Sequence, residues 1–457
     1  MKRFTVRPRI AAGIRIRVGG GPEDGDHVLI GRLAEAGPLI PVMHDLGGEH
    51  VVAIVGKRGS GKSYTLGSML EGLCTTVGGS PIGKISGTRA VLLFDTLGIF
   101  QWADIVLSPE SDQDIVRRQY SSRRGWDLPP TPLSMMIWLP KSDTGPGRPT
   151  RHAEFTVRAS DLDASDWGYL LGLDILQDRM GQLLNDAYTK VTIEGWGDGV
   201  TRPPKPDYDV SDLLDCLRTD RELQASYQSE TRRAVLQQLT TYTRNPLFGA
   251  PGTSLKDLLQ PGSLSVVVMN RMSDELRFVL ITALVRRFMK ARIEASELEK
   301  DLAIRSDLTD EERERVRTVL AQGVPPSWIT VYEAQNFLPS ERRTNAAEVL
   351  VKLVREGRNY GLSFALTTQQ PTAIDPRIMA QVDTLIAHKL TIQTDIEYVR
   401  RNLKGGLPEE VKYANSVLEF DDLVRSLDVG QALVSNTETE RALIVDVRPR
   451  IGVHGGF

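Results

Sequence analysis

The stretch His50-Val51-Val52-Ala53-Ile54-Val55-Gly56-Lys57-Arg58-Gly59-Ser60-Gly61-Lys62-Ser63 decides the fold of this chain. Its first half is an apolar run typical of a buried β-strand, and its second half has the G-x-x-x-x-G-K-S spacing of a phosphate-binding loop. Glycines let such a loop curl so that successive backbone N–H groups point at a phosphate. The helix predicted from residue 62 to about 74 adds the positive end of its dipole. The competing interpretation, an ordinary glycine-rich turn, does not explain why an apolar strand precedes the loop and a helix follows it.

The predicted ligand of this loop is ATP with Mg²⁺. Lys62 is expected to reach the β- and γ-phosphates, and the Ser63 hydroxyl to bind the cation. The predicted nucleotide contacts are Gly56, Arg58, Gly59, Ser60, Gly61, Lys62, Ser63 and Tyr64.

Bulk composition places the chain among ordinary globular proteins with room for two or three domains. It has 457 residues, a hydrophobic content of 40%, a charged content of 25% and a formal net charge of −3. No apolar run approaches the length of a membrane span and no signal peptide opens the sequence, so we expect a cytoplasmic protein without a membrane partner. The two cysteines, Cys74 and Cys216, point away from a disulfide scaffold. The mild acidity does not exclude nucleic-acid binding, because basic residues can be concentrated in one channel.

Patterns along the chain predict an α/β fold interrupted by a helical segment. Strand-like runs at residues 264–269, 328–332 and 362–367 alternate with helical stretches, which favours a parallel sheet. The predicted parts are a small N-terminal β-module over 1–46, a core over 47–150 and 253–438, a mainly helical insertion over 151–252, and a C-terminal strand and arm over 439–457.

Two acidic residues follow predicted strands and are candidates for a catalytic carboxylate. Asp95 ends the apolar run 90–94, and Glu333 ends the run 328–332. The carboxyl ends of parallel strands form the ligand edge of an open α/β sheet. A P-loop ATPase needs a carboxylate there to hold the metal's water or to polarise the attacking one. Helix caps use acids at such positions too, so a structural role stays open for each residue.

Further motifs follow one another in order over most of residues 27–451. They are Ile30-Gly31-Arg32-Leu33, 254–262, 270–277, 329–338, 355–361, Thr367-Thr368-Gln369-Gln370-Pro371 and Val447-Arg448-Pro449-Arg450. In this order the chain resembles the HerA–FtsK superfamily of hexameric motor ATPases, and most closely its HerA branch. The resemblance implies a RecA-like P-loop NTPase core with a reduced N-terminal β-barrel-like module and a helical insertion. It also implies a homo-oligomer, namely a hexamer.

The resemblance implies a role for several residues. Glu333 would be the general base that orients water, and Gln369 would sense the γ-phosphate. Arg358 would be an arginine finger inserted into the neighbouring subunit's site, with Arg355 as its rival. A charge supplied in trans makes hydrolysis wait for assembly and contributes ~10³–10⁵ in rate. The competing interpretation of Arg358 is an exposed arginine at a helix end.

The chain departs from the family pattern beside Glu333. Tyr332 stands where the family usually has a second acid, and Gln335 stands where it usually has a histidine. A tyrosine does not hold a metal-bound water as a carboxylate does, so we expect weaker Mg²⁺ affinity or slower turnover. Asp95 is the residue that we expect to compensate by lying near the metal.

Loops after the core strands would face the pore of a ring. Arg342 and Arg343 are the candidates for contact with DNA phosphates, together with residues 371–377. Solvated loops are an equally good interpretation of these charges.

The leading functional prediction is an ATP-driven, ring-shaped translocase or helicase that acts on double-stranded DNA. It would work with a separately encoded nuclease or other effector, in DNA end processing or antiviral defence. The alternative is an ATP-binding hexameric scaffold that assembles and regulates an effector with little translocation. A secretion or conjugation motor is the third possibility, which the lack of an apolar span disfavours.

Overall fold

The chain forms two compact units. The computed structural model describes residues 15–22, 25–34, 39–74, 82–85, 89–123, 125–145, 147–199, 201–249, 251–340, 344–403, 410–413, 416–439 and 441–456. The first unit consists of Met1–Ile137, Lys256–Asn270 and Met289–Phe457. The second unit consists of Trp138–Leu255 and Arg271–Phe288.

A parallel sheet forms the centre of the first unit. In the described part of the chain its strands lie in the order β9 (Leu264–Val268), β6 (Ala90–Asp95), β10 (Ser327–Val331), β11 (Leu362–Thr368), β4 (Val51–Val55) and β12 (Thr384–Ala387). These strands are almost entirely buried, as expected for a parallel sheet that is covered on both faces. Because they run the same way, their carboxyl ends meet at one edge.

Antiparallel strands extend this sheet beyond β12. They follow in the order β15 (Gln431–Asn436), β16 (Arg441–Val447), β2 (His27–Leu33), β3 (Pro41–Asp45) and β1 (Ile16–Val18), which pairs in parallel with β3, while β5 (Gly83–Lys84) pairs with β2. The strands predicted for the N-terminal β-module therefore continue the core sheet through the β2–β16 pairing. A separate hairpin joins β13 (Glu410–Tyr413) to β14 (Ser416–Glu419).

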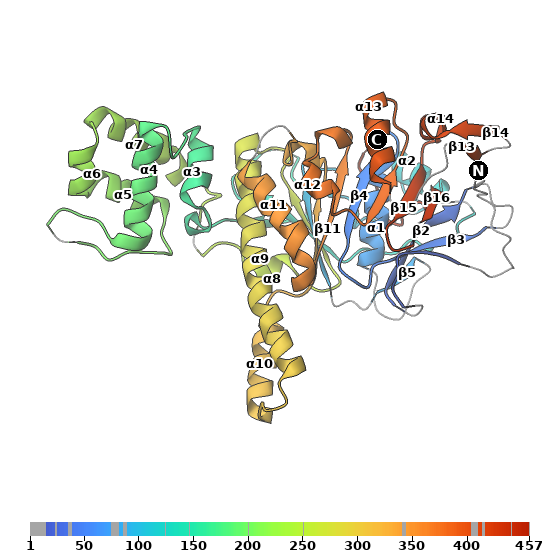
Figure 1. The fold of residues 1–457 in the computed structure, drawn as a ribbon, viewed down its shortest axis with the longest axis horizontal. Coiled ribbons are helices and arrows are strands. Elements are labelled where there is room, and N and C mark those ends of the chain that lie inside the picture. The colour runs from blue at the N-terminus through green and yellow to red at the C-terminus, as the bar shows by residue number, and fades with distance from the viewer. Residues whose placement is uncertain are drawn as a thin grey trace. The chain divides into compact units, whose positions relative to one another are not determined.

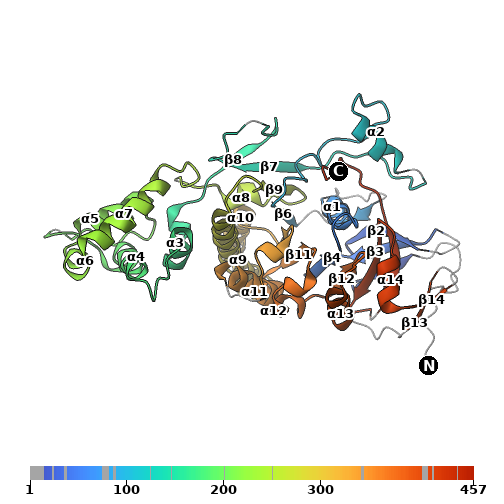
Figure 2. The ribbon, with the colours of Figure 1, turned by 90° about the horizontal axis from the view of Figure 1, so that it is seen from above.

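Helices cover both faces of the central sheet (Figure 2). One face carries α1 (Lys62–Leu73), and the other carries α11 (Asn345–Glu356), α12 (Pro376–Met379) and α13 (Gln393–Asn402). This unit also contains α2 (Asp114–Ser121), α14 (Phe420–Ser426) and the short turns η3 (Ala334–Asn336), η4 (Gly357–Tyr360) and η5 (Pro371–Ala373). The short α8 (Leu255–Leu258) leads into β9.

A helical hairpin follows β9, where the sequence pattern predicts helices over 274–295 and 309–321. In the structure α9 runs from Asp274 to Ile304, further than predicted, and α10 (Asp310–Gln322) turns back along its end (Figure 1). Thr309 ends the turn because its hydroxyl accepts the backbone N–H of Glu312 at 3.3 Å, while the Glu312 carboxylate accepts the N–H of Thr309 at 2.8 Å. This reciprocal cap begins a new helix despite the mixed charges around it.

The second unit is mainly helical. It contains α3 (Ala164–Leu171), α4 (Arg179–Thr189), α5 (Val210–Thr219), α6 (Arg221–Ser226) and α7 (Ser229–Thr243), preceded by the short turn η1 (Ala159–Asp161). A π-helical turn, η2 (Lys190–Glu194), continues α4, and β7 (Met135–Pro140) pairs with β8 (Ala153–Phe155). The buried Trp167 donates its indole N–H to Tyr208 at 2.7 Å.

The second unit extends beyond the predicted insertion at 151–252. Its range begins at Trp138, where β7 pairs with β8, and it includes the N-terminal part of α9 as far as Phe288. The α9 residue Phe278 packs against Tyr169 with ring centroids 5.3 Å apart, and Arg286 pairs with the buried Asp166 at 2.8 Å. Within the residues described, no helix is both long and apolar enough to cross a membrane.

Candidate nucleotide site

The phosphate loop joins the carboxyl end of β4 to the first turn of α1, as its sequence predicts. Gly59 and Gly61 have φ angles of 75° and 114°, in the left-handed region where a side chain would be strained. Gly61 is also the N-cap of α1, and the first turn of this helix carries no acidic residue. Its first N–H groups and the positive end of its dipole are therefore oriented for a bound anion.

Lys62 is held inside this loop. Its side chain is 4% exposed, and Nζ donates to the Lys57 carbonyl at 3.1 Å. The Ser60 hydroxyl donates to the same carbonyl at 2.8 Å. Burial lowers the pKa of Lys62, and the negative charge of Glu333 opposes that effect. The ammonium group thus lies where the loop would enclose a phosphate, with the Glu333 carboxylate close enough to act on it.

Glu333 follows β10 at the same edge of the sheet, as predicted. Its φ of 57° is left-handed, which is rare and strained for a residue other than glycine, and its side chain is 3% exposed. Gln369 donates to one carboxylate oxygen, Nε2 to Oε1, at 3.0 Å. Gln335 donates to the other, Nε2 to Oε2, at 2.7 Å. Two neutral amides therefore fix the orientation of this carboxylate.

Strand β11 separates Glu333 from the phosphate loop. The order β10-β11-β4 places the carboxylate two strand spacings from β4, or roughly 10 Å. Gln369 directly follows β11 and so stands between them. This spacing leaves room for a terminal phosphate and a water molecule between Lys62 and Glu333.

Asp95 closes a turn. Its carboxylate is fully buried and accepts the backbone N–H groups of Leu97 at 3.2 Å, Gly98 at 2.9 Å and Phe100 at 2.8 Å. Burial raises its pKa to about 6, and the backbone hydrogen bonds oppose the increase. Both oxygens of Asp95 are directed into its own loop, which agrees with the structural interpretation of this residue and gives no support to a contact with the metal.

A cavity of about 540 Å³ opens beside the phosphate loop. It is lined by the loop with the start of α1, by helix α2 and the residue after it, by the segment around Gly430, by Val447 and by residues 454–456. Its lining residues are Gly59, Gly61, Ser63, Tyr64, Thr65, Ile115, Arg118, Gln119, Ser122, Val429, Gly430, Val447, His454 and Gly456. The sequence predicts the loop residues and Tyr64 but not the α2 and C-terminal residues, because nothing in their local pattern distinguishes them.

Two histidines contact the loop and its helix, and neither was among the predicted site residues. His388 follows β12, with its Nε2 2.8 Å from Thr65 Oγ1 and its Nδ1 2.7 Å from the Gln431 carbonyl oxygen. His454 places Nε2 3.3 Å from Ser63 Oγ. Burial lowers the pKa of each to about 4, so both rings are neutral near pH 7. The position of His388 directly after the apolar run 385–387 is the signal that could have identified it.

A model of the family described as "Helicase HerA, central domain" matches residues 28–288. The chain belongs to this family. It is similar to the DNA double-strand break repair helicase HerA of Pyrococcus furiosus, with 23% identity over 359 residues that cover 76% of this chain and 57% of that protein. It is also similar to the probable DNA double-strand break repair helicase HerA of Methanocaldococcus jannaschii, with 30% identity over 134 residues that cover 29% of this chain and 24% of that protein.

The likeness to these HerA proteins is partial in length. Only 57% of the Pyrococcus protein is covered by the match. Among solved structures, VirB4 of Thermoanaerobacter pseudethanolicus superposes with a TM-score of 0.52 at 15% identity, covering 94% of this chain and 98% of that one. At this identity the likeness concerns the fold. It confirms the predicted α/β class with a RecA-like P-loop core.

The predicted finger, Arg358, lies away from the phosphate loop of its own chain. It belongs to η4, which precedes the amino end of β11, whereas the loop and Glu333 lie at the carboxyl edge. A strand of seven residues spans roughly 23 Å between those two edges. The side chain is 70% exposed, and its Nη2 is 3.9 Å from the Glu438 carboxylate. Arg358 therefore does not join this HerA-family site from within its own chain.

The predicted DNA contacts have different outcomes. Arg342 and Arg343 lie outside the described residues. In the 371–377 segment, Arg377 donates to Asp375 at 2.7 Å and to Glu348 at 2.8 Å. The hydrogen bonds to these two carboxylates raise the pKa of Arg377, whose charge they neutralise. Its arrangement does not favour a contact with phosphates.

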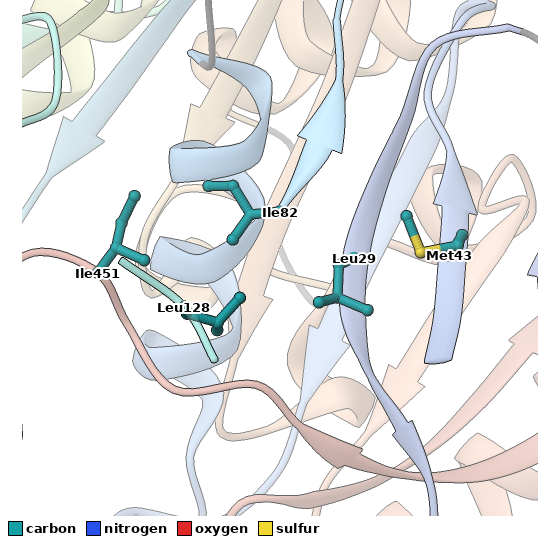
Figure 3. Packing of buried hydrophobic residues seen from close by; sticks show 5 residues of the cluster. All are labelled: Leu29, Met43, Ile82, Leu128 and Ile451. Carbon is teal, nitrogen blue, oxygen red and sulfur yellow. The ribbon is translucent and has the colours of Figure 1, made fainter. Parts of the chain in front are cut away.

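The C-terminal arm is clamped onto α1. Glu71 is fully buried and accepts from Arg448 at 2.9 Å and from Arg450 at 2.5 Å. Burial alone would raise the pKa of Glu71, but the two guanidinium groups outweigh it and hold that pKa below its ordinary value. Ile451 packs in an apolar cluster with Leu29, Met43, Ile82 and Leu128 (Figure 3). These contacts fix the segment that carries His454 to Ser63.

Proposed function

We propose that this chain is an ATP-hydrolysing, ring-forming motor that acts on double-stranded DNA. The observation that carries the proposal is the edge of the parallel sheet, where the phosphate loop with Lys62 faces the strained, buried Glu333 across Gln369. Membership of the HerA family and the names of its curated relatives support DNA as the track.

Each residue at this edge takes one part in hydrolysis. Lys62 and the N–H groups of the loop bind the β- and γ-phosphates. Glu333 orients the attacking water and accepts its proton, and Gln369 contacts the γ-phosphate. Because Gln369 now donates to Glu333 at 3.0 Å, a γ-phosphate that draws this amide away frees one carboxylate oxygen for water. In this proposal, binding of the triphosphate therefore makes Glu333 available to orient water.

Mg²⁺ fits this site with few protein ligands. The described residues contain no group of three or more His, Cys, Asp or Glu side chains that could hold a metal ion. Mg²⁺ in nucleotide sites is bound mainly by phosphate oxygens and water, with one or two protein oxygens, so the Ser63 hydroxyl is a sufficient protein ligand. When bound, the cation neutralises charge on the β- and γ-phosphates.

The apolar cavity beside the loop receives the base and ribose of the nucleotide. It adjoins the phosphate cradle and is large enough for a nucleoside at about 540 Å³. Val429 lines this cavity and is 78% exposed, so its side chain is accessible to a bound base.

Arg358 acts in trans in this proposal. It lies at the amino edge of the sheet and is largely exposed, so a neighbouring subunit presents it to the carboxyl edge of the next. A head-to-tail arrangement of this kind closes into a ring. We propose a homohexamer, by the resemblance to HerA-type motors, and Arg342 and Arg343 as contacts with DNA in its pore.

The cellular setting rests on the family alone. We propose a cytoplasmic motor that serves a separately encoded nuclease or other effector, in DNA end processing or in antiviral defence. The alternative, a nucleotide-switched scaffold with little translocation, is favoured by Tyr332 in place of an acid and by the amides on both oxygens of Glu333.

ATP turnover with and without linear duplex DNA tests both functions. We expect duplex DNA to stimulate turnover strongly. Turnover should be lost in Lys62→Ala and in Glu333→Gln, and Glu333→Gln should still bind ATP. Native mass with and without ATP is expected to show a hexamer. Slow turnover that duplex leaves unchanged would favour the scaffold, and normal hydrolysis by Lys62→Ala would refute the site itself.

A further inference from the structure

The turn η4, which carries Arg358, lies against one face of helix α9. Arg292, Ser296 and Lys300 follow one another at four-residue spacing, in the part of α9 that belongs to the first unit. Side chains at this spacing lie in a row along one face of a helix. Each of the three contacts η4. The sequence spacing of these α9 residues therefore provides a continuous support for the turn.

The support acts on the main chain at the end of η4. Arg292 donates from Nε to the Tyr360 carbonyl at 2.7 Å, and Ser296 donates from Oγ to the Asn359 carbonyl at 3.3 Å. The Lys300 ammonium lies 5.7 Å from the centroid of the Tyr360 ring, within the range of a cation–π contact. The last carbonyls of a helical turn lack partners inside the turn, so these two side-chain donors supply them.

Arg292 is itself held in a fixed orientation. Its side chain is 1% exposed, and Nη1 donates to the Val324 carbonyl at 2.9 Å. Nη1 and Nη2 each donate to one carboxylate oxygen of Glu299 at 2.9 Å. Val324 leads into β10, so the guanidinium joins η4 to the entry of a central strand. A lysine would keep the positive charge but lacks the planar fork that makes all of these hydrogen bonds at once.

The Arg358 side chain contrasts with its backbone. Arg358 directly precedes Asn359, whose carbonyl accepts from Ser296, so the main chain beside it is fixed. Its guanidinium is 70% exposed and makes a long ion pair of 3.9 Å with Glu438. Arg358 is therefore a long, exposed side chain on a fixed base, which is the arrangement that lets a cation reach a defined point outside its own chain.

We propose that Arg292 is a positioning residue for Arg358. It holds the backbone of η4 so that Arg358 enters the neighbouring subunit's nucleotide site at the correct point. The proposal rests on the function proposed above, in which Arg358 acts in trans. A purely structural role for Arg292 would affect the whole subunit that lacks it. A positioning role instead leaves that subunit's own nucleotide site intact and impairs hydrolysis in its neighbour.

Arg292→Lys tests this difference. We expect the Kd for a fluorescent ATP analogue to stay close to that of the parent. The kcat should fall about 10- to 100-fold, because a displacement of about 1 Å at a reacting centre can cost ~10²-fold in rate. The matched control is Arg313→Lys. Arg313 also donates to backbone carbonyls near the end of α9, those of Leu302, Arg305 and Leu308, but not to η4, so kcat should stay at the parental value.

Mixed oligomers show which site is impaired. Lys62→Ala subunits retain both Arg292 and Arg358, so mixing them with Arg292→Lys subunits should raise turnover above the sum of the separate proteins. Mixing Arg292→Lys with Arg358→Ala should give no such gain, because neither kind of subunit then presents a correctly placed Arg358. A purely structural role predicts no gain in either mixture.

Ser296→Ala provides a milder variant that decides the question if Arg292→Lys does not fold. It removes one hydrogen bond to η4, so we expect a smaller fall in kcat and the same response to mixing. Parental kcat in every folded variant of the pair would overturn the proposal. It would also be overturned if Lys62→Ala subunits restore Arg358→Ala but not the Arg292 or Ser296 variants. Failure to restore Arg358→Ala itself would instead refute the proposed action of Arg358 in trans.

Discussion

The buried charge cluster around Glu71 allows a quantitative prediction for Glu71→Gln. Glu71 is fully buried and accepts from Arg448 and Arg450, and also from the backbone N–H groups of Ile451 and Gly452 at 3.1 Å each. Glutamine has the same shape but no charge. It leaves two buried guanidinium groups, each no more than 2% exposed, without a counter-ion. The substitution therefore removes charge with little change in packing.

The expected cost follows from that uncompensated charge. Breaking a buried ion pair by neutralising one partner costs about 3–5 kcal/mol. The first unit has roughly 300 residues, and an unfolding entropy of about 2.1 cal/mol/K per residue gives roughly 0.6 kcal/mol per kelvin. The Tm should therefore fall by about 5–8 °C. Because Glu71 also fixes the segment that carries His454 to the cavity, nucleotide affinity should weaken too.

The assay is thermal unfolding followed by circular dichroism, with and without a non-hydrolysable ATP analogue. Glu49→Gln is the matched control, since Glu49 pairs with Arg89 at 2.9 Å but remains 26% exposed, and its loss should cost about 0–1 kcal/mol. If Glu71→Gln melts no lower than Glu49→Gln, the clamp contributes little and the reasoning is refuted.

The same cluster has a pH dependence with a definite sign. The folded pKa of Glu71 lies below its ordinary value of 4.5, so its stabilisation is present above that pH and is lost as the pH falls through the folded pKa. At pH 7 the free energies of unfolding of the parent and of Glu71→Gln should therefore differ by the full amount. The gap between their stabilities should narrow below about pH 4.5.

Two further predictions concern the subunit contact and the buried histidines. Arg358→Ala should bind nucleotide normally, but its kcat should fall by ~10³–10⁵. Mixing it with Lys62→Ala subunits, which still carry Arg358, should restore turnover in trans. If mixing restores no turnover, Arg358 does not act in the neighbouring subunit's site. His44, His388 and His454 each have a pKa lowered to about 4 by burial, so the unfolded chain binds their protons first and the fold loses stability as pH falls from about 6.5 to 4. At pH 5.5 each of the three histidines should lower the free energy of unfolding by about 1.4 kcal/mol. Urea unfolding at pH 7.5 and at pH 5.5 measures this loss, and equal free energies of unfolding at the two pH values would contradict the prediction.

Sequence patterns predicted the parts of the site that are local. The phosphate loop is one continuous stretch of sequence, and the spacing of its Gly, Lys and Ser residues predicts phosphate binding. Glu333 could be placed because a residue after a parallel strand must lie at the carboxyl edge, wherever that strand falls in the sheet. The rest of the site depends on strand order. That β11, and with it Gln369, stands between Glu333 and the loop follows from pairings that no local pattern encodes.

The sequence patterns did not predict the contacts between distant parts of the chain. Ser63 and His454 are 391 positions apart, and Glu71 and Arg450 are 379 apart. The sequence predicts an exposed arm at Arg448-Pro449-Arg450, because arginines outside a core are ordinarily solvated. Only the fold shows that a buried acid on α1 neutralises both. For Asp95 the sequence left two roles open, a catalytic carboxylate or a structural cap, because both occur directly after a strand. Its hydrogen bonds to backbone N–H groups favour the structural role.

Helix α1 connects the two halves of the site mechanically. It begins at the phosphate loop, and Glu71 lies nine residues along it, or about 14 Å at 1.5 Å per residue. A helix of this length moves as a rigid body, so a shift of the loop on binding triphosphate acts on the clamp at Glu71. The clamped segment returns to the loop through His454, which contacts Ser63 at 3.3 Å. The loop, α1, the Glu71 ion pairs and His454 thus form a closed series of contacts, so a displacement of the loop would be transmitted to the hydrogen bond at Ser63 or to the ion pairs of Glu71.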